Sequence, residues 1–338
     1  MDIAQNTQAP TVSVIIPTYR HQDLISQTLE SVFSQTFGDF EVIVVNDGSP
    51  DRTGDLLAPF AANGKIRYFA QRNAGQAAAR NRGAIEARGK FFAFLDDDDL
   101  WPPDKLEWQV KYLEAKPGVG VVAGRCESFL DKIPTHRAAP IEDASANGPI
   151  DFILLARSCP IESPGQTLIR WNLFRELGGF DPDPDLSGAD DYDFWLRALR
   201  RNRIELLARI ALFHRSHPGN ASKNADQMFS SNLAVAKRHL STGSPTMSPA
   251  AFEAFYDHVY EFAGHRLTRD WTFLWSGSQN RWARLRNRGK CLHTMMGERR
   301  FRRLFLQGLV RAVQRRLRTL AARLFPGTSR PSALDRGA

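Results

Sequence analysis

Short apolar runs alternate with longer amphipathic segments in the first part of the chain. The runs VSVIIP, FEVIVV and FFAFL contain almost no polar positions, which is typical of strands buried on both faces, and KIRYFA is a further short strand. Residues that favour turns follow two of these runs, at Pro17 and in the cluster Asn46–Gly48. Alternating strands and helices predict an α/β fold with a doubly wound, mostly parallel sheet.

The segments between these strands have helical periodicity. In QDLISQTLESVFSQTF the apolar positions recur every three or four residues, so one face of the helix is apolar. A second helix is expected over GQAAARNRGAIEARG, closed by Gly89, and a third over PPDKLEWQVKYLE, because proline is tolerated in a first helical turn. The apolar face of the first helix consists of Leu24, Ile25, Thr28, Leu29, Val32 and Phe33.

The pattern weakens after VGVVAG into a loop-like region over about residues 131–150. The stretch from Gly165 to Asn202 then predicts a strand, a short helix, a turn, an acidic loop and an amphipathic helix. Past Ser222 the sequence becomes helical and aromatic. We therefore expect a domain boundary near residue 222, with residues 1–10 as a disordered N-terminus.

Composition places the chain among ordinary globular proteins, with 42% hydrophobic and 24% charged residues in 338. The net charge of +8 is concentrated between residues 281 and 323, which contain fourteen Lys or Arg and one acidic residue, so the remainder is acidic overall. The three cysteines have neither disulfide nor zinc-site spacing, which favours a reducing compartment. With no signal-like N-terminus and no run of about 18 apolar residues, a cytoplasmic location is expected.

The fourth strand ends in four consecutive aspartates, Asp96 to Asp99, whose mutual repulsion requires a positive partner. One interpretation is a helix start, since acidic residues are favoured near the positive end of a helix dipole. Another is a calcium loop, but Trp101 occupies the position that requires glycine. A third is a site for Mg²⁺ or Mn²⁺, in which Asp96 and Asp98 share the ion with the phosphates of a substrate.

Five segments occur together in a characteristic order. They are SVIIPTYR, EVIVVNDGSPD, NAGQAAARNRG, FFAFLDDDDLWPPDKLE and GGFD followed by ADDYDFWLR. In order and spacing this set resembles the inverting glycosyltransferases of family 2, of the bacterial cell-surface polysaccharide type, over about residues 11 to 222. The resemblance implies a GT-A fold, Rossmann-like, with a nucleotide-sugar half at 11–125, an acceptor half at 126–222 and a C-terminal helical extension.

The resemblance also implies roles for residues in the first half. Pro17, Thr18 and Tyr19 would line the pocket of the nucleotide base, and Asp47 would accept a hydrogen bond from that base. The family usually has two consecutive acids here, whereas this chain has Asn before Asp47, and the alternative for NDGSPD is a simple turn. Arg80 would contact the anionic nucleotide, with a solvated helix face as the alternative.

The acidic run would hold the metal in such an enzyme. By the resemblance, Asp98 is the direct ligand, Asp96 contacts the ribose or supports the metal, and Asp97 is the variable middle residue on the donor side. Asp99 is expected to be a helix-start acid. His217 matches a family histidine near the diphosphate and is a candidate metal ligand, although a loop histidine is also a common polar surface residue.

The second acidic pair, Asp190 and Asp191, begins an amphipathic helix, so a helix cap explains one carboxylate. In the family the second acid is the general base, which makes Asp191 the expected catalytic residue. Asp190 stands where relatives have Glu and is expected on the acceptor side with Trp195. Asp193 is a rival for the base.

The tail at 223–338 is expected to be helical and basic, with an amphipathic helix over about 299–325. Its apolar stripe and arginine-rich remainder suit an anionic membrane surface, and packing against protein is the alternative. The expected partners are thus a nucleotide-diphosphate sugar, a glycan or lipid-linked acceptor, and the inner face of the plasma membrane. Nucleic acid is not expected, because the basic residues lie outside the carboxylate domain. A nucleotide-sugar pyrophosphorylase or a non-catalytic sugar-nucleotide binder is the alternative function.

Overall fold

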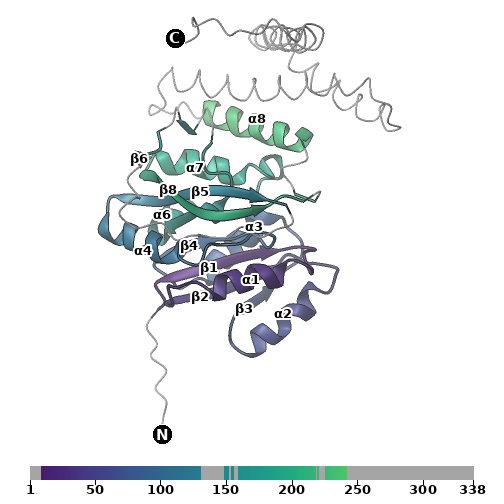
Figure 1. Cartoon of the computed structure of the whole chain (residues 1–338). Helices are drawn as coiled ribbons and strands as arrows, with labels where there is room; N and C mark the ends of the chain where they lie inside the picture. The colour runs from purple at the N-terminus through teal and green to yellow at the C-terminus, as the bar shows by residue number, and fades with distance from the viewer. Residues whose placement is uncertain are drawn as a thin grey trace, which may run out of the picture. The chain divides into compact units, whose positions relative to one another are not determined.

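A computed structural model describes residues 9–130, 148–151, 154–155, 159–217, 219–220 and 225–241. The chain divides into two compact units, Met1–Phe255 and Tyr256–Ala338, and every described residue belongs to the first. That unit is built on one eight-stranded sheet in the order β3-β2-β1-β4-β7-β5-β8-β6 (Figure 1). The predicted α/β class is therefore confirmed.

The strands and helices follow one another much as the sequence predicts. The strands are β1 Val12–Thr18, β2 Phe40–Asn46, β3 Arg67–Ala70, β4 Phe91–Phe94, β5 Val119–Phe129, β6 Gly148–Pro149, β7 Thr167–Arg170 and β8 Arg203–Arg215. The α-helices are α1 Ile25–Phe33, α2 Thr53–Ala62, α3 Gln76–Glu86, α4 Lys105–Ala115, α6 Trp171–Glu176, α7 Asp190–Leu199 and α8 Ala225–Ser241. Two short 3-10 helices, η2 Pro164–Gln166 and η3 Pro184–Leu186, complete the set.

The first four strands form the parallel half of the sheet. β1 pairs in parallel with β2 and with β4, and β2 pairs in parallel with β3. Because these strands run in one direction, their carboxyl ends reach the same edge of the sheet, where ligands bind in such folds. The polar residues after β1, β2 and β4 therefore meet at this edge.

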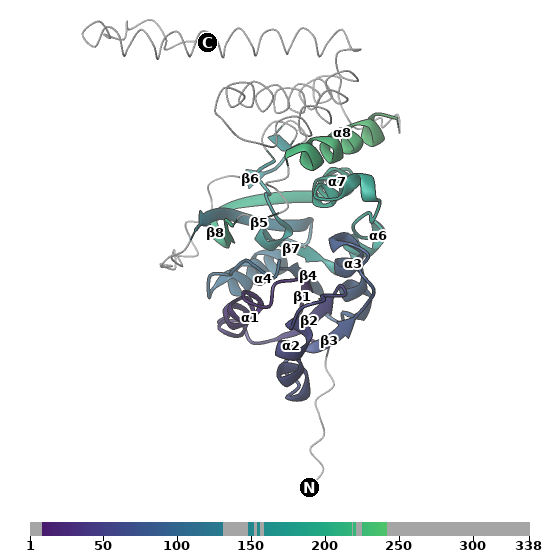
Figure 2. The same ribbon diagram turned by 90° about the vertical axis from the view of Figure 1, so that its right-hand side faces the viewer.

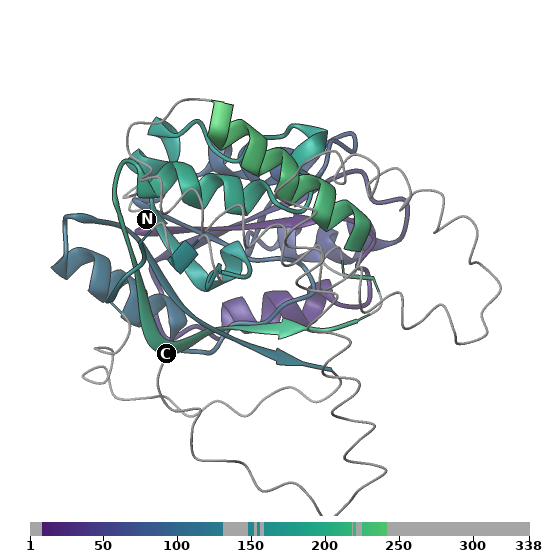
Figure 3. The ribbon, with the colours of Figure 1, turned by 90° about the horizontal axis from the view of Figure 1, so that it is seen from above.

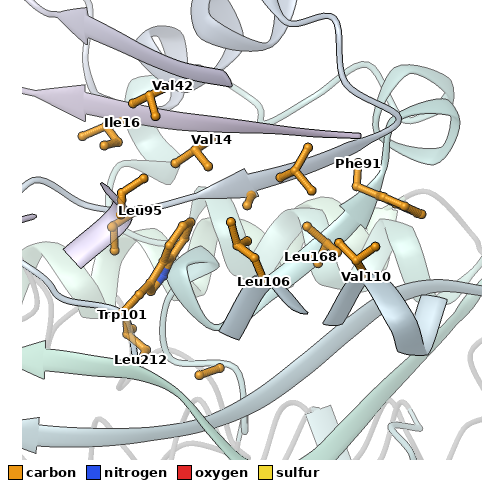
Figure 4. Close-up of a cluster of buried hydrophobic side chains, with 14 of the residues drawn as sticks. Val14, Ile16, Val42, Phe91, Leu95, Trp101, Leu106, Val110, Leu168 and Leu212 are labelled. Carbon is orange, nitrogen blue, oxygen red and sulfur yellow. The ribbon is translucent and has the colours of Figure 1, made fainter. Parts of the chain in front are cut away.

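Both faces of the parallel half are buried, which explains why its strands are apolar at successive positions. On one face, alternate residues of β1 and β2 pack against α1, α2 and α4. Val14 of β1, Val42 of β2 and Leu106 of α4 belong to this core (Figure 4). The intervening residues Ile43 and Val45 pack against Ala79 of α3 on the other face. Successive residues of each strand thus enter opposite cores, and this alternation fixes the register of the strands.

An aromatic cluster fills the second face beyond α3. Phe94 of β4 lies 5.3 Å from Phe174 of α6 and 5.0 Å from Phe180, measured between ring centroids. Phe194 of α7 lies 5.0 Å from Phe180. Tilted and edge-to-face contacts of this kind stabilise aromatic pairs beyond their burial. The cluster attaches α6 and α7 to the sheet and thereby positions the start of α7.

β8 was not predicted from the apolar pattern, because the charged residues Glu205 and Arg209 interrupt its sequence. Both are buried, and Arg209 pairs with Asp104 at 2.5 Å. β8 runs parallel to β5, and Phe213 near its end forms an isolated antiparallel bridge with Leu100. This bridge brings the end of β8 to the acidic run after β4.

α8 is the part of the expected tail that the structure describes. It packs against η3 and α7. It lies at the end of the domain opposite α2 and β3 (Figure 2), and Figure 3 shows this helix in green from above. The amphipathic helix expected over about 299–325 lies outside the described residues, and the boundary at 222 stays a prediction. None of the described helices combines the length and apolar character that crossing a bilayer requires.

Two glycines of this domain permit close packing. Gly89 does not close α3, which ends at Glu86; a Cβ at Gly89 would lie 2.5 Å from the backbone nitrogen of Ser13, so the residue lets the chain pass against β1. Gly83 lies inside α3, where a Cβ would lie 2.4 Å from Cγ2 of Ile15. Both positions set how closely this part of the chain approaches the sheet.

Gly83→Ala is expected to destabilise the fold by about 1–2 kcal/mol, because overpacking costs about 1–3 kcal/mol and exceeds the gain of about 1 kcal/mol in helix propensity. The measurement is the free energy of unfolding in urea. Gly38→Ala is the matched control, since a Cβ there meets nothing within 4 Å. Equal stability of the two variants would contradict the close packing of α3 on β1.

Candidate active site

Each of the four consecutive aspartates after β4 has a different basic partner. Asp96 pairs with Arg80, and Asp97, Asp98 and Asp99 pair with three histidines, at distances between 2.6 and 3.0 Å. These partners come from α3, from the turn after β1 and from the end of β8. The repulsion within the run is thus offset by groups from three separate parts of the chain.

Asp96 and Arg80 link the two acidic clusters of the sequence. One amino group of Arg80 donates to Oδ1 of Asp96 at 2.6 Å, and the other donates to Oδ2 of Asp190 at 3.0 Å. Arg80 is only 3% exposed, and its guanidinium lies over the ring of Phe180, 5.4 Å from the centroid. Arg80 therefore does not lie on a solvated helix face, and it joins the end of β4 to the start of α7.

Asp97 is buried between β1 and α1. Its carboxylate accepts a hydrogen bond from the backbone N–H of Tyr19 at 3.1 Å and one from Nδ1 of His21 at 2.6 Å. The hydrogen bond to Asp97 is the largest cause that raises the pKa of His21, to about 9, while burial opposes it. Asp97 thus fixes the turn that follows β1 and orients the imidazole of His21.

Asp98 faces the loop after β8. Nε2 of His217 lies 2.9 Å from its Oδ2, and the amide of Asn220 lies 3.5 Å from the same oxygen. The backbone carbonyl of Asp98 accepts from Nε of Arg215 at 2.9 Å. The structure therefore brings together the two residues that the sequence analysis assigned to the metal, although 119 positions separate them.

Asp99 is not a helix-start acid, which corrects the expectation from the sequence. It is 1% exposed, and the residue at the start of α4 is Asp104. Its carboxylate accepts from Nδ1 of His214 at 3.0 Å and from the backbone N–H of Arg215 at 2.9 Å. Burial raises the pKa of Asp99, and the hydrogen bond to Asp99 raises the pKa of His214. Asp99 anchors the end of β8.

Asp190 and Asp191 occupy the first turn of α7, as expected. Asp190 is buried against Arg80, and burial raises its pKa. Asp191 is half-buried, and its Oδ1 accepts the N–H of Tyr192 at 2.7 Å. Burial, followed by the charge of Asp190, raises the pKa of Asp191 to about 7. A carboxylate with such a pKa can accept a proton near neutral pH.

Asp193, the rival for the base, is engaged in the interior. Nε2 of His239 in α8 lies 2.8 Å from one carboxylate oxygen, and Nε of Arg197 donates to the other at 2.7 Å. Although burial opposes the shift, these partners lower the pKa of Asp193. Asp193 therefore holds α8 against α7, which leaves Asp191 as the better candidate.

The predicted base pocket lies at the ends of β1 and β2. Pro17 and Thr18 are buried, and Tyr19 is 37% exposed beyond the end of β1. Both oxygens of Asp47 accept hydrogen bonds from the chain, including the N–H groups of Ala74 and Gly75 at 2.9 Å. Asp47 thus fixes the turn before α3, and its contact with a nucleotide base stays a prediction.

Trp195 does not lie where an acceptor could touch it. Its side chain is fully buried and packs edge-to-face on Phe194, with 5.2 Å between the ring centroids. The residue is one helical turn beyond Asp191, on the face of α7 that packs into the domain. Its expected place on the acceptor side is therefore corrected to a place in the core.

Three residues of the described chain could bind one metal ion. His21, Asp98 and His217 each offer a ligand atom, and these atoms lie within 4.8 Å of one another. Two imidazole nitrogens and one carboxylate oxygen form a donor set that fits a divalent cation. His21 was not among the residues predicted from the sequence. Its position three residues after β1, at the same sheet edge as the aspartates, is the feature that could have indicated it.

Comparison with known proteins agrees with this geometry. Residues 13–178 match the sequence profile described as Glycosyl transferase family 2. An uncharacterised glycosyltransferase of Rickettsia typhi is 29% identical over 223 residues, which cover 65% of this chain and 69% of that protein. TuaG of Bacillus subtilis, whose name assigns it to teichuronic acid biosynthesis as a glycosyltransferase, is 41% identical over 106 residues, covering 31% of this chain and 42% of TuaG.

Two solved structures share the fold. S. aureus TarS 1-349 in complex with UDP-GlcNAc has a TM-score of 0.57 at 20% identity, covering 78% of this chain and 73% of TarS. The mannosyltransferase PcManGT from Pyrobaculum calidifontis, in complex with GDP-Man and Mn²⁺, has a TM-score of 0.55 at 20% identity, covering 95% of this chain and 89% of PcManGT. These two likenesses confirm the expected GT-A fold, and the profile match identifies residues 13–178 as a glycosyltransferase family 2 domain.

Proposed function

We propose that this glycosyltransferase inverts the sugar that it transfers and requires a divalent metal. The donor would be a nucleotide-diphosphate sugar, with a UDP-sugar as the first choice, and the acceptor would be a hydroxyl of a glycan or of a lipid-linked molecule. The observation that carries this proposal is the bridge from Asp96 through Arg80 to Asp190, because it places the donor edge of the sheet beside the candidate base at the start of α7.

Asp191 is the proposed general base. Its raised pKa, about 7, allows the carboxylate to accept the proton of an acceptor hydroxyl near neutral pH. The hydroxyl oxygen then forms a bond to the anomeric carbon from the face opposite the diphosphate, and the bond from that carbon to the phosphate oxygen breaks with its electron pair leaving on the phosphate. A single displacement of this kind inverts the anomeric configuration.

Asp98 and His217 would hold the metal, since their ligand atoms already lie 2.9 Å apart at the sheet edge. When bound, a divalent ion neutralises the negative charge that develops on a diphosphate leaving group. Asp96 would contact the donor beside that site, since Arg80 and Gln76 hold one of its oxygens and its side chain is 20% exposed. The chain thus supplies both the binding groups and their orientation.

The identity of the nucleotide base is a separate question from the donor class. TarS is bound to UDP-GlcNAc and PcManGT to GDP-Man, so the shared fold accommodates either base. Tyr19 is the proposed ring against the base, since it is the exposed aromatic residue at the end of β1. The polar neighbours Thr18 and Asp47 would add hydrogen bonds from the same edge.

The proposed acceptor and location rest on the name of one relative and on the composition of the tail. The name of TuaG assigns that protein to teichuronic acid biosynthesis, and a cytoplasmic enzyme at the inner face of the plasma membrane would meet an acceptor glycan on a lipid carrier. The basic amphipathic segment at about 299–325 would lie in that anionic surface. Screening the purified full chain with Mn²⁺ against a panel of nucleotide sugars, by release of the nucleoside diphosphate, tests the donor class directly.

Asp191→Asn is expected to keep nucleotide binding and to lose transfer by about 10²–10⁴-fold, because the amide cannot accept the proton. Binding is followed by calorimetry with the nucleoside diphosphate and transfer by product formation. The matched control is Asp185→Asn, an exposed acid of η3, which precedes α7. Neither a pyrophosphorylase nor a non-catalytic binder needs this base, so wild-type turnover in Asp191→Asn would reject the assignment.

The pH dependence of transfer by the wild-type enzyme should report the titration of Asp191. Because the deprotonated form of Asp191 is active, kcat/KM should rise about tenfold per pH unit up to a pH of about 7 and then level off. Residual turnover in Asp191→Asn should lack this limb. An acidic limb of equal steepness in both proteins would assign the titration to another residue.

Asp98→Asn is expected to weaken nucleotide binding in the presence of Mn²⁺ by at least about tenfold while leaving binding in EDTA unchanged, because a neutral amide is a poorer ligand than a carboxylate. The measurement is a nucleotide titration with and without the metal. Asp23→Asn, an exposed acid before α1, is the control. Equal metal dependence in both variants would remove Asp98 from the metal site.

A further inference from the structure

His21 lies opposite the two residues proposed to bind the metal. Its ring is 5.6 Å from the ring of His217 between centroids, at an interplanar angle of 87°. Ligand atoms of His21, His217 and Asp98 all lie within 4.8 Å of one another, which is close to the separation of about 4.4 Å that two ordinary bonds of about 2.2 Å to nitrogen or oxygen span across one ion. The third corner of the candidate site is therefore provided by the turn after β1.

Among the residues that the structure describes, Asp97 pairs with Nδ1 of His21, and the ligand in our proposal would bind Nε2. Nδ1 lies 2.6 Å from Oδ1 of Asp97, so this nitrogen carries the proton that Asp97 accepts. A metal-binding histidine usually donates its other N–H to a carboxylate or carbonyl in this manner, which fixes the ring and its tautomer. Asp97 is 6% exposed and also accepts the N–H of Tyr19, so the orienting carboxylate is itself held in place.

The backbone around His21 is equally constrained. The carbonyl of His21 accepts the N–H groups of Leu24 and Ile25 at 3.1 and 3.0 Å, which ties the residue to the start of α1. Arg20 adopts a left-handed conformation with φ of 62°, a state that a non-glycine residue adopts only where the surrounding structure imposes it. A histidine that merely neutralised Asp97 would not require a ligand atom within 4.8 Å of those of Asp98 and His217.

We propose that Nε2 of His21 is a third protein ligand of the metal, so that the site consists of two imidazoles and one carboxylate and selects a first-row transition-metal ion over Mg²⁺. This inference deepens the proposed function and rests on its metal site. Mg²⁺ prefers oxygen ligands in octahedral geometry, whereas imidazole nitrogen favours transition-metal ions. With three protein ligands, the ion would still have positions open to diphosphate oxygens.

Pulsed EPR of Mn²⁺ bound to the full chain, without nucleotide, tests the ligand directly, because it detects nitrogen nuclei coordinated to the ion. The wild type should show coupling to two imidazoles, and His21→Ala and His217→Ala should each show coupling to one. His214→Gln is the matched control, since His214 belongs to the same cluster but pairs with Asp99. Thermal unfolding of each variant establishes that it is folded.

Affinity supplies the second readout. His21→Ala should weaken Mn²⁺ binding by at least about tenfold, and Asp97→Asn, which removes the orienting carboxylate, should weaken it by about 10–100-fold. Mg²⁺ binding should change much less, so the preference for Mn²⁺ over Mg²⁺ should shrink in both variants. A titration that follows the EPR signal of free Mn²⁺, with Mg²⁺ as competitor, measures both quantities.

The outcomes separate this inference from the proposed function. Coupling to a single imidazole in the wild type, or unchanged Mn²⁺ affinity in folded His21→Ala, would overturn the role of His21 and leave Asp98 and His217 as the metal site. No Mn²⁺ binding by the wild-type chain would overturn the metal site as a whole.

Discussion

Four adjacent carboxylates at the end of a buried strand repel one another, and the rest of this site is organised by that constraint. Each carboxylate has its own basic partner, Arg80 for Asp96 and three histidines for the others. Breaking a buried pair of this kind is costly, because an uncompensated charge remains in a medium of low dielectric constant. The partners therefore fix the turn as firmly as its backbone does.

The topology determines where these partners come from. The parallel order β2-β1-β4 brings the turns after three strands to one edge, and β8 returns to the same edge through the bridge between Leu100 and Phe213. The aromatic cluster around Phe180 then places α7 against α3, where Arg80 joins both acidic clusters. The sheet edge, the return of β8 and the aromatic cluster together assemble one site from distant segments.

The sequence was informative where the signal is local. Apolar runs gave most strands and helices, and short polar motifs gave Asp98 and Asp191 at the ends of elements, where the structure places them. Pairings between distant residues were beyond this reasoning: Arg80 and Asp190 are 110 positions apart, and His214 is 115 positions from Asp99. For the same reason the sequence predicts a helix-start acid at Asp99 and an acceptor-side residue at Trp195, whereas the structure buries both side chains.

The bridge between Leu100 and Phe213 also bears on how the protein is made. Two of the three histidines that compensate the aspartates follow Phe213, so a nascent chain that stops before this point contains the acidic run without them. Contacts between such distant residues form late, because closing a long loop costs entropy before the contacts repay it. On the ribosome, the charged centre of the enzyme therefore cannot become complete until β8 and the histidines at its end have been synthesised.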